Sequence, residues 1–296
     1  MKKILAMLLA ISLVFAFVAC GEEKSVEVNS LKPTDALKKY VVDVYTANGF
    51  SADATINYGD ATETVKFSVI APFDNSRMQY VYNGSVNNVA FVSEIVDGAK
   101  LNFFYHTDAE GNKVANWIDA KLIATNKDIK PYMLSKILVS DSAAFEEDSI
   151  SMEFSGEGNM VFEGTALSSS MVMGYKDVYP VPEDGDKAAY DEEVKALKYV
   201  YTVENNELVS LTIDGTVNGK PFSVKAENFQ AFEKGTALTV EGADSYAKDV
   251  TAAEIAEIKK QQEAEAKAAA EAAKAAEEAA TKEAAAGSGA GTTDVE

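Results

Sequence analysis

Cysteine and histidine are almost absent from this 296-residue chain, and their scarcity limits its chemistry. Cys20 is the only cysteine, so no disulfide can form within the chain and the fold must be stable from its core alone. His106 is the only histidine, and its place at a strand end beside a turn predicts an exposed loop position. Metal sites and base-activated nucleophiles usually need an imidazole with partners. The sequence therefore predicts no metal site and no catalytic residue.

The sequence motifs of nucleotide binding and of hydrolases are missing as well. The chain has no Gly-x-Ser-x-Gly elbow, no P-loop and no Gly-x-Gly-x-x-Gly. Its formal net charge of −20 repels phosphates, which argues against DNA or RNA as a partner. Acidic residues are so common that a chance pair of carboxylates carries no argument for glycoside hydrolysis. We therefore expect a protein that is not an enzyme and uses no cofactor.

The start of the chain has the layout of a bacterial secretion signal. Lys2 and Lys3 precede an uncharged apolar run, 4–19, which is shorter than the roughly 20 residues of a membrane-spanning helix. The run ends in FVACG at 17–21, which resembles the lipobox of bacterial lipoproteins, although Phe17 stands where leucine is usual. The resemblance implies cleavage before Cys20 and acylation of its sulfur. Such chains hold a protein to a bilayer because each buried methylene contributes about 0.8 kcal/mol.

These features predict a lipoprotein signal peptide at 1–19 and a polar tether at 20–30. The protein is then lipid-anchored at the extracytoplasmic face of the cell membrane, and Gly21 favours a Gram-positive cell. Two alternatives stay open, an ordinary cleaved signal with a chance cysteine and an uncleaved anchor.

Region 31–250 is expected to form one α+β domain. Apolar and polar residues alternate in short segments, and turns join most of the neighbours, so about 10–11 strands form a mainly antiparallel sheet. The clearest are 50–58, 64–70, 78–82, 89–95, 101–105, 150–154, 160–162, 199–203, 209–213 and 222–226. Helical periodicity predicts helices at 33–48, 129–139 and about 186–196. The apolar face of the helix at 33–48 consists of Leu37, Tyr40, Val41, Val44 and Tyr45. The stretch 165–186, which contains Ser168–Ser170, is expected to be irregular.

The order of these elements resembles the LolA/LppX-like lipoproteins. An amphipathic helix follows the tether, antiparallel strands come next, a helix interrupts them, and three strands at 199–203, 208–213 and 222–226 close the domain. Trp117 and this closing pattern also resemble Gram-positive lipoproteins of unknown role. The resemblance implies a curved half-barrel sheet on 2–3 helices, with an apolar concavity that binds acyl chains or other lipid. The candidate cavity-lining residues are the inward aromatics Phe67, Tyr80, Phe91 and Phe103, unless they simply fill a core, as inward aromatics usually do.

Two acidic turns, 108–112 and 183–186, are the nearest approach to a metal motif. Asp108, Glu110 and Asn112 place side-chain oxygens at alternate positions, as calcium loops do. The terminal glutamate and the loop length of an EF-hand are missing. Solvated turns are therefore the better interpretation.

The end of the chain, 251–296, has low complexity. Thr251 and Glu254 form a capping box, and alanine, glutamate and lysine then predict a helix over 251–286, followed by a disordered tail at 287–296. Only Ile255 and Ile258 are large and apolar, so no coiled-coil seam is expected. The helix is a spacer, a partner-binding arm or a solubilising tail.

Together these patterns predict a membrane-anchored, non-enzymatic lipoprotein that binds a lipid or other hydrophobic ligand in a half-barrel cavity. The alternative is a structural or protein-interaction module of the cell envelope with a filled core and no ligand. The membrane, reached through the N-terminal lipid, is the expected partner, and any protein partner is unknown.

Overall fold

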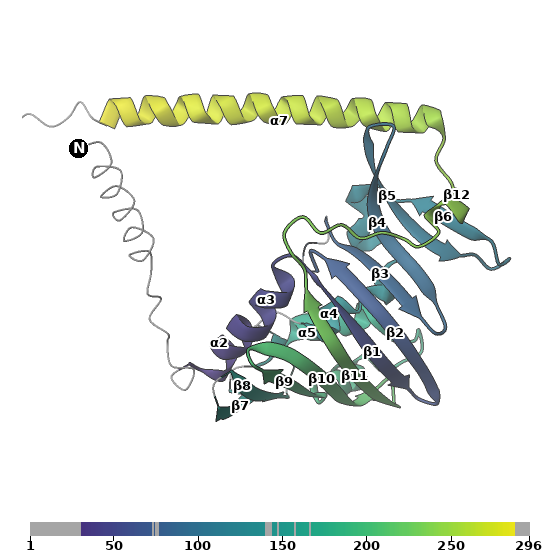
Figure 1. Ribbon diagram of the computed structural model, residues 1–296, viewed down its shortest axis with the longest axis vertical. Coiled ribbons are helices and arrows are strands. Elements are labelled where there is room, and N and C mark those ends of the chain that lie inside the picture. The colour runs from purple at the N-terminus through teal and green to yellow at the C-terminus, as the bar shows by residue number, and fades with distance from the viewer. Residues whose placement is uncertain are drawn as a thin grey trace, which may run out of the picture. The chain divides into compact units, whose positions relative to one another are not determined.

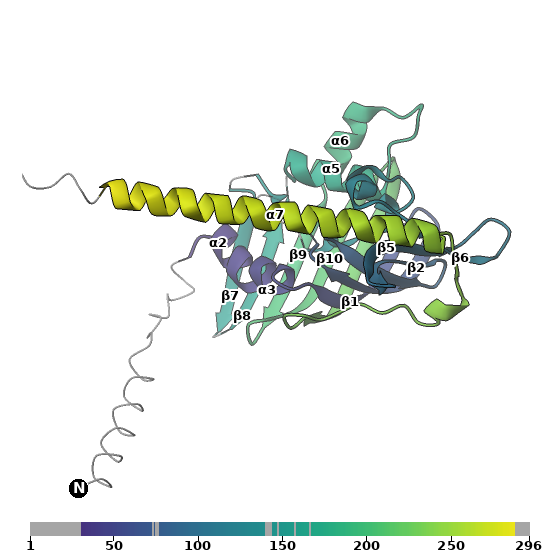
Figure 2. The ribbon, with the colours of Figure 1, turned by 90° about the horizontal axis from the view of Figure 1, so that it is seen from above.

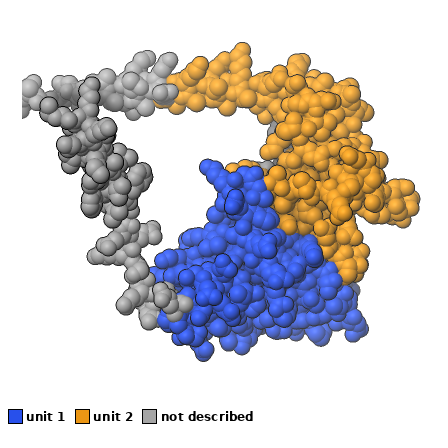
Figure 3. All heavy atoms as spheres, in the orientation of Figure 1, with its two compact units in different colours: residues 1–67, 133–236 blue, residues 68–132, 237–296 orange. Residues whose placement is uncertain are grey.

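The computed structural model describes residues 31–72, 74, 77–139, 144–146, 148–156, 158–165 and 167–287 (Figure 1). The predicted signal peptide, Cys20, the tether up to residue 30 and the tail from residue 288 lie outside the described residues. The chain divides into two compact units (Figure 3). Unit 1 comprises Met1–Phe67 and Met133–Thr236, and unit 2 comprises Ser68–Tyr132 and Ala237–Glu296.

Twelve strands of the described chain form an open sheet in the order β12-β6-β5-β4-β3-β2-β1-β11-β10-β9-β8-β7. Every pairing with a defined register is antiparallel except β12 with β6, which is parallel. The α+β class and the mainly antiparallel open sheet are thus confirmed. The expected 10–11 strands were too few, because β6 (Lys113–Trp117) and β12 (Ala247–Lys248) are short and carry no clear apolar alternation.

Unit 1 contains β1 (Phe50–Tyr58), β7 (Ile150–Gly156), β8 (Asn159–Gly164), β9 (Lys198–Glu204), β10 (Glu207–Val217), β11 (Lys220–Ala231) and the first part of β2 (Ala61–Ile70). Most of these strands have one buried and one more exposed face, whereas β7 buries only Ile150. In β9, Tyr199, Tyr201 and Val203 are buried, whereas the residues between them are partly or fully open to solvent. One face of these strands therefore carries the core.

The first helical stretch of unit 1 contains an irregular turn. It consists of α2 (Pro33–Leu37), a π-helical turn η2 (Lys38–Val42) and α3 (Asp43–Thr46). The wider turn rotates the apolar face relative to a regular helix. As a result Val42 is buried and Val44 is 42 % exposed, so the predicted inward position of Val44 was wrong.

The predicted irregular stretch 165–186 instead contains a helix, α5 (Ser169–Val178). Ser168 has the extended backbone of an N-cap, and Met171, Val172, Tyr175 and Val178 turn into the core. The predicted helix at 186–196 is α6 (Lys187–Lys195), capped by the Asp186 carboxylate. Region 129–139 is broken into η4 (Lys130–Tyr132) and α4 (Ser135–Leu138), and η3 (Ala120–Thr125) precedes them.

Tyrosines dominate the core of unit 1. The hydroxyls of Tyr175 and Tyr199 are 2.7 Å apart and hydrogen bonded, and both side chains are fully buried. Burial raises the pKa of both phenols well above the usual value, because it disfavours the phenolate. Phe222 and Phe145 pack edge-on against Tyr175 and Tyr199, respectively. This core is therefore filled by rings whose polar ends satisfy one another.

Unit 2 contains β3 (Gln79–Gly84), β4 (Asn88–Val96), β5 (Ala99–Thr107), β6, β12 and the last residues of β2. Both faces of β4 and β5 carry buried residues. Cross-strand partners lie on the same face, and Tyr80, Phe91 and Phe104 follow one another across β3, β4 and β5. Neighbouring Val92 and Phe103 pair on the opposite face and are also buried.

The second face is covered by chain from far along the sequence. Leu238, Val240, Tyr246, Val250 and Ile258 pack against its buried cluster, which includes Ile255 itself. The 3-10 turn η6 (Ala243–Ser245) lies in this covering segment. Contacts between residues more than 130 positions apart thus complete the core of unit 2.

The C-terminal region forms one long helix, α7 (Figure 2). It spans Ala252–Gly287 and begins within one residue of the predicted start. The capping box is present, since the Thr251 N–H donates to Glu254 Oε2 and the Glu254 N–H donates to Thr251 Oγ1. Ile255 is 7 % exposed, and Gln262 exchanges two hydrogen bonds with the backbone of Lys100 in β5. The first turns are therefore docked on unit 2, whereas side chains 263–276 are exposed.

Candidate functional site

The four candidate cavity-lining aromatics are fully packed in the structure. Phe67 and Phe91 are 1 % exposed, and Tyr80 and Phe103 are 0 % exposed. Phe67 lies in unit 1, with its ring edge toward Phe50 at 6.2 Å. Tyr80 donates a hydrogen bond to the Ile129 carbonyl at 3.0 Å. These side chains lie in the packed core of their units.

The register separates the candidates of unit 2 into two groups. The rings of Tyr80 and Phe91 meet at 6.2 Å on one face of the sheet. Phe103 lies on the other face, where it pairs with Val92 and has the Lys248 ammonium 4.8 Å above its ring. The three therefore do not face one common space, because adjacent strand residues point to opposite sides.

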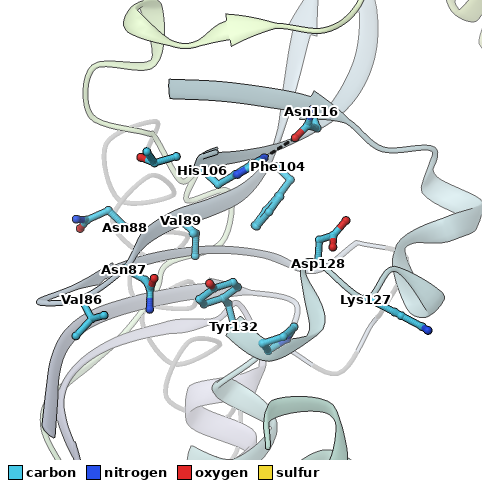
Figure 4. A pocket seen from close by; sticks show the side chains of 12 residues that line it. Val86, Asn87, Asn88, Val89, Phe104, His106, Asn116, Lys127, Asp128 and Tyr132 are labelled. Carbon is cyan, nitrogen blue, oxygen red and sulfur yellow. Dashed lines mark hydrogen bonds between the residues drawn. The ribbon is translucent and has the colours of Figure 1, made fainter. Parts of the chain in front are cut away.

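A pocket of about 740 Å³ opens on the face of unit 2 that carries Tyr80 and Phe91 (Figure 4). It is lined by Val86, Asn87, Asn88 and Val89 at the β3–β4 turn, Phe104, His106 and Thr107 of β5, Asn116 of β6, and Lys127, Asp128, Pro131 and Tyr132. None of the four candidate aromatics lines it. Its size falls within the roughly 300–1,000 Å³ of typical small-molecule sites.

Aromatic rings form the base of this pocket. The rings of Phe104 and His106 are stacked, with centroids 4.9 Å apart and planes 21° from parallel. Tyr132 lies 6.2 Å from Phe104 and meets Tyr82 edge-on at 5.4 Å. The strand alternation produces this arrangement, since Phe104 and His106 are two residues apart on β5 and share one face.

A chain of hydrogen bonds fixes the imidazole of His106. His106 Nε2 is hydrogen bonded to Asn116 Oδ1 on the neighbouring strand (Figure 4). Asn116 Nδ2 donates to Asp249 Oδ2 at 3.0 Å, and Asp249 Oδ1 accepts the Trp117 N–H at 2.6 Å. His106 is thus a half-buried strand residue, and its predicted exposed loop position was wrong.

Polar groups surround the opening. In the described part of the chain, the side chains of Asn88, Thr107, Lys127 and Asp128 have no protein partner. Lys127 and Asp128 carry opposite charges, so the pocket lining is close to neutral. The arrangement therefore combines ring surfaces with donors and acceptors that are open to a ligand.

In each of the two acidic turns, an aspartate carboxylate accepts hydrogen bonds from nearby residues of the chain. Asp108 Oδ1 accepts the N–H groups of Glu110 at 3.0 Å and Asn112 at 2.7 Å, and Asp108 Oδ2 accepts Asn112 Nδ2. The Asn112 side chain and backbone lower the pKa of the Asp108 carboxyl. Asp186 in the second turn caps α6. No group of three potential metal-binding side chains occurs among the described residues.

The pocket itself was missed by sequence reasoning. The available signal was the pair Phe104 and His106, two residues apart on a strand, opposite Asn116 on the next. Only Phe103 of this strand was predicted as an inward aromatic, whereas Phe104 and His106 lie on the opposite face.

Comparison with known proteins adds no family to this description. No family model matches the sequence, and a search of the curated proteins finds no significant relative. Of the helices in the described ranges, none combines the length and apolar character needed to cross a membrane.

Proposed function

We propose that this protein is a lipid-anchored, non-enzymatic binding module of the bacterial cell envelope. Cys20 holds it at the extracytoplasmic face of the membrane, and the pocket of unit 2 holds its ligand. The observation that carries the proposal is this pocket, which has stacked rings at its base and, at its opening, the side chains of Asn88, Thr107, Lys127 and Asp128, which have no partner among the described residues.

The anchor is supported by the sequence alone. Positive charge at Lys2 and Lys3, the apolar run 4–19 and the lone Cys20 follow the order of a lipoprotein signal. The polar residues 21–30 then separate the lipid from the folded units.

A positioning role for His106 is supported by its hydrogen bond. His106 Nε2 is bonded to the Asn116 amide oxygen, which fixes the orientation of the ring. This arrangement suits a side chain that positions a ligand.

The structure favours a polar ligand over the acyl chain implied by the LolA/LppX-like resemblance. The four aromatics expected to line a lipid cavity are at most 1 % exposed, so an acyl chain would have to displace packed rings. The pocket, by contrast, is open and carries amides, a hydroxyl and charged groups. A half-barrel that carries lipid remains the second proposal, and the following experiments distinguish the two.

The anchor is tested by detergent phase partitioning of the full chain made in a bacterial host. The wild type is expected in the detergent phase, and Cys20→Ala is expected in the aqueous phase. Ser25→Ala, a small change in the tether, serves as the control and should partition like the wild type. A Cys20→Ala chain that stays in the detergent phase would refute anchoring through this sulfur.

The ligand class is tested by native mass spectrometry of the Cys20→Ala chain. The expected spectrum shows the bare protein mass, because the four candidate aromatics are closely packed in the core of their units. Co-purified lipid would instead support the lipid carrier and count against the pocket as the principal site.

A further inference from the structure

We propose that the pocket of unit 2 binds a neutral saccharide. The inference rests on the proposed function, since it names the ligand class of the same pocket. It is argued from three features: the ring surfaces, the proton position on His106 and the charge balance of the opening.

The ring surfaces fit the face of a sugar. Phe104 is only 5 % exposed and supports His106, whose ring is stacked on it. His106 and Tyr132 are half-buried and line the pocket. A pyranose ring has an apolar C–H face and a rim of hydroxyls, so it matches a site of rings bordered by polar groups.

The hydrogen-bond chain determines which nitrogen of His106 carries the proton. The Asp249 carboxylate only accepts, so Asn116 must direct its NH₂ group toward Asp249 and its oxygen toward His106. His106 Nε2 must then donate, which leaves Nδ1 of the neutral ring as an acceptor. No described residue donates to Nδ1, so a ligand hydroxyl can.

The opening offers donors and acceptors together. A sugar hydroxyl both donates and accepts, and so do the Asn88 amide and the Thr107 hydroxyl; Asp128 accepts and Lys127 donates. An anionic ligand would meet a single ammonium within a chain of net charge −20. An acyl chain would desolvate the amides without replacing their hydrogen bonds. A neutral ring with several hydroxyls satisfies the site best.

The experiment uses the Cys20→Ala full chain labelled with ¹⁵N-histidine. His106 is the only histidine, so the imidazole gives one pair of ring nitrogen signals. Without ligand, Nε2 is expected to carry the proton of the neutral ring, because it donates to Asn116 Oδ1. Adding chitotriose or maltotriose at millimolar concentration should shift the Nδ1 signal and saturate.

Two matched variants test the location. Asp128→Asn should weaken saccharide binding by about tenfold, because an acceptor for sugar hydroxyls is lost. Asp184→Asn makes the same change at an exposed position outside the pocket lining and should leave affinity unchanged. His106→Ala should abolish measurable binding, and Asp128→Asn keeps the test valid if His106→Ala fails to fold.

Several results would overturn the proposal. They are a proton on Nδ1, an unshifted signal with both trisaccharides, equal weakening by Asp128→Asn and Asp184→Asn, or a shift with decylphosphocholine in place of the saccharides. Detergent partitioning of Cys20→Ala is independent of all of them. The proposal of a lipid anchor and the proposal of a saccharide site can thus be refuted separately.

Discussion

Unit 1 and unit 2 keep water from their strands in different ways. In β9 of unit 1 the buried residues alternate with more open ones, so one face of the strand forms the core. In unit 2, four consecutive residues of β4, Val89–Val92, are buried, as are Phe103–Tyr105 of β5. A strand buried on both sides needs two covers, and unit 2 takes one of them from the residues after Ala237.

This contrast explains why the pocket is in unit 2. On the covered face, the segment from Leu238 to Ile258 packs closely over the cluster. On the other face, Ile129 and Tyr132 cover Tyr80 and Tyr82, and the pocket remains over Phe104 and His106. A sheet that is buried on both faces can hold a rigid apolar layer beneath a site. A binding pocket requires such support.

The largest expected effect comes from Phe103→Ala. Removing a fully buried ring from the covered face should lower the free energy of unfolding of unit 2 by about 3–5 kcal/mol. Hydrogen exchange followed by mass spectrometry should show faster exchange in β4–β6. Phe162→Ala in β8, also fully buried, is the matched change in unit 1 and should accelerate β7–β9 instead. Equal acceleration of all these strands by both variants would show that the units unfold as one.

Ile255→Ala tests whether the start of α7 belongs to the core of unit 2. We expect a loss of about 2–3 kcal/mol in unfolding free energy, because the side chain is 7 % exposed within the cluster. Ile95→Ala, at a position 71 % exposed in β4, should change stability by less than about 0.5 kcal/mol. Thermal unfolding measures both. Similar melting temperatures for the two variants would mean that α7 is not docked.

In unit 1, removal of the paired hydroxyls of Tyr175 and Tyr199 is expected to lower the free energy of unfolding by a smaller and non-additive amount. Either Tyr→Phe change alone leaves one buried hydroxyl without its partner and should cost about 1–3 kcal/mol. The double variant should cost less than the sum of the single variants. Urea denaturation of the four proteins gives the coupling energy, and strict additivity would contradict a direct hydrogen bond.

The same pair makes unit 1 sensitive to alkali. Burial raises the folded-state pKa of both tyrosines above the unfolded value of about 10. Their contribution to stability is complete below about pH 10 and falls as pH rises through the folded-state values. The urea midpoint of the wild type should therefore decline above about pH 10, and more steeply than that of the double Phe variant.

The sequence predicted the parts of the fold that depend on local pattern. Strict alternation located β9, β10 and β11, and the capping box at Thr251 located the start of α7. The sequence could not predict which residues of unit 2 lie on which face of the sheet. The runs 89–92 and 103–105 are apolar at every position, so they show no alternation that assigns residues to a face. The pocket depends on that assignment and on Asp249, 133 positions from Asn116, so no local pattern contained it.

The smallest expected effect is that of Gln262→Ala, which compares the docked and exposed parts of α7. Its amide accepts the Lys100 N–H at 3.0 Å and donates to the Lys100 carbonyl at 2.7 Å. Loss of both bonds at an exposed site should cost about 1 kcal/mol and accelerate exchange of the Lys100 amide. Gln261→Ala removes the neighbouring exposed amide and gains the same helix propensity, so it should be neutral or slightly stabilising. If both variants behave alike, Gln262 does not hold the helix to β5, and the docked segment ends before Gln262.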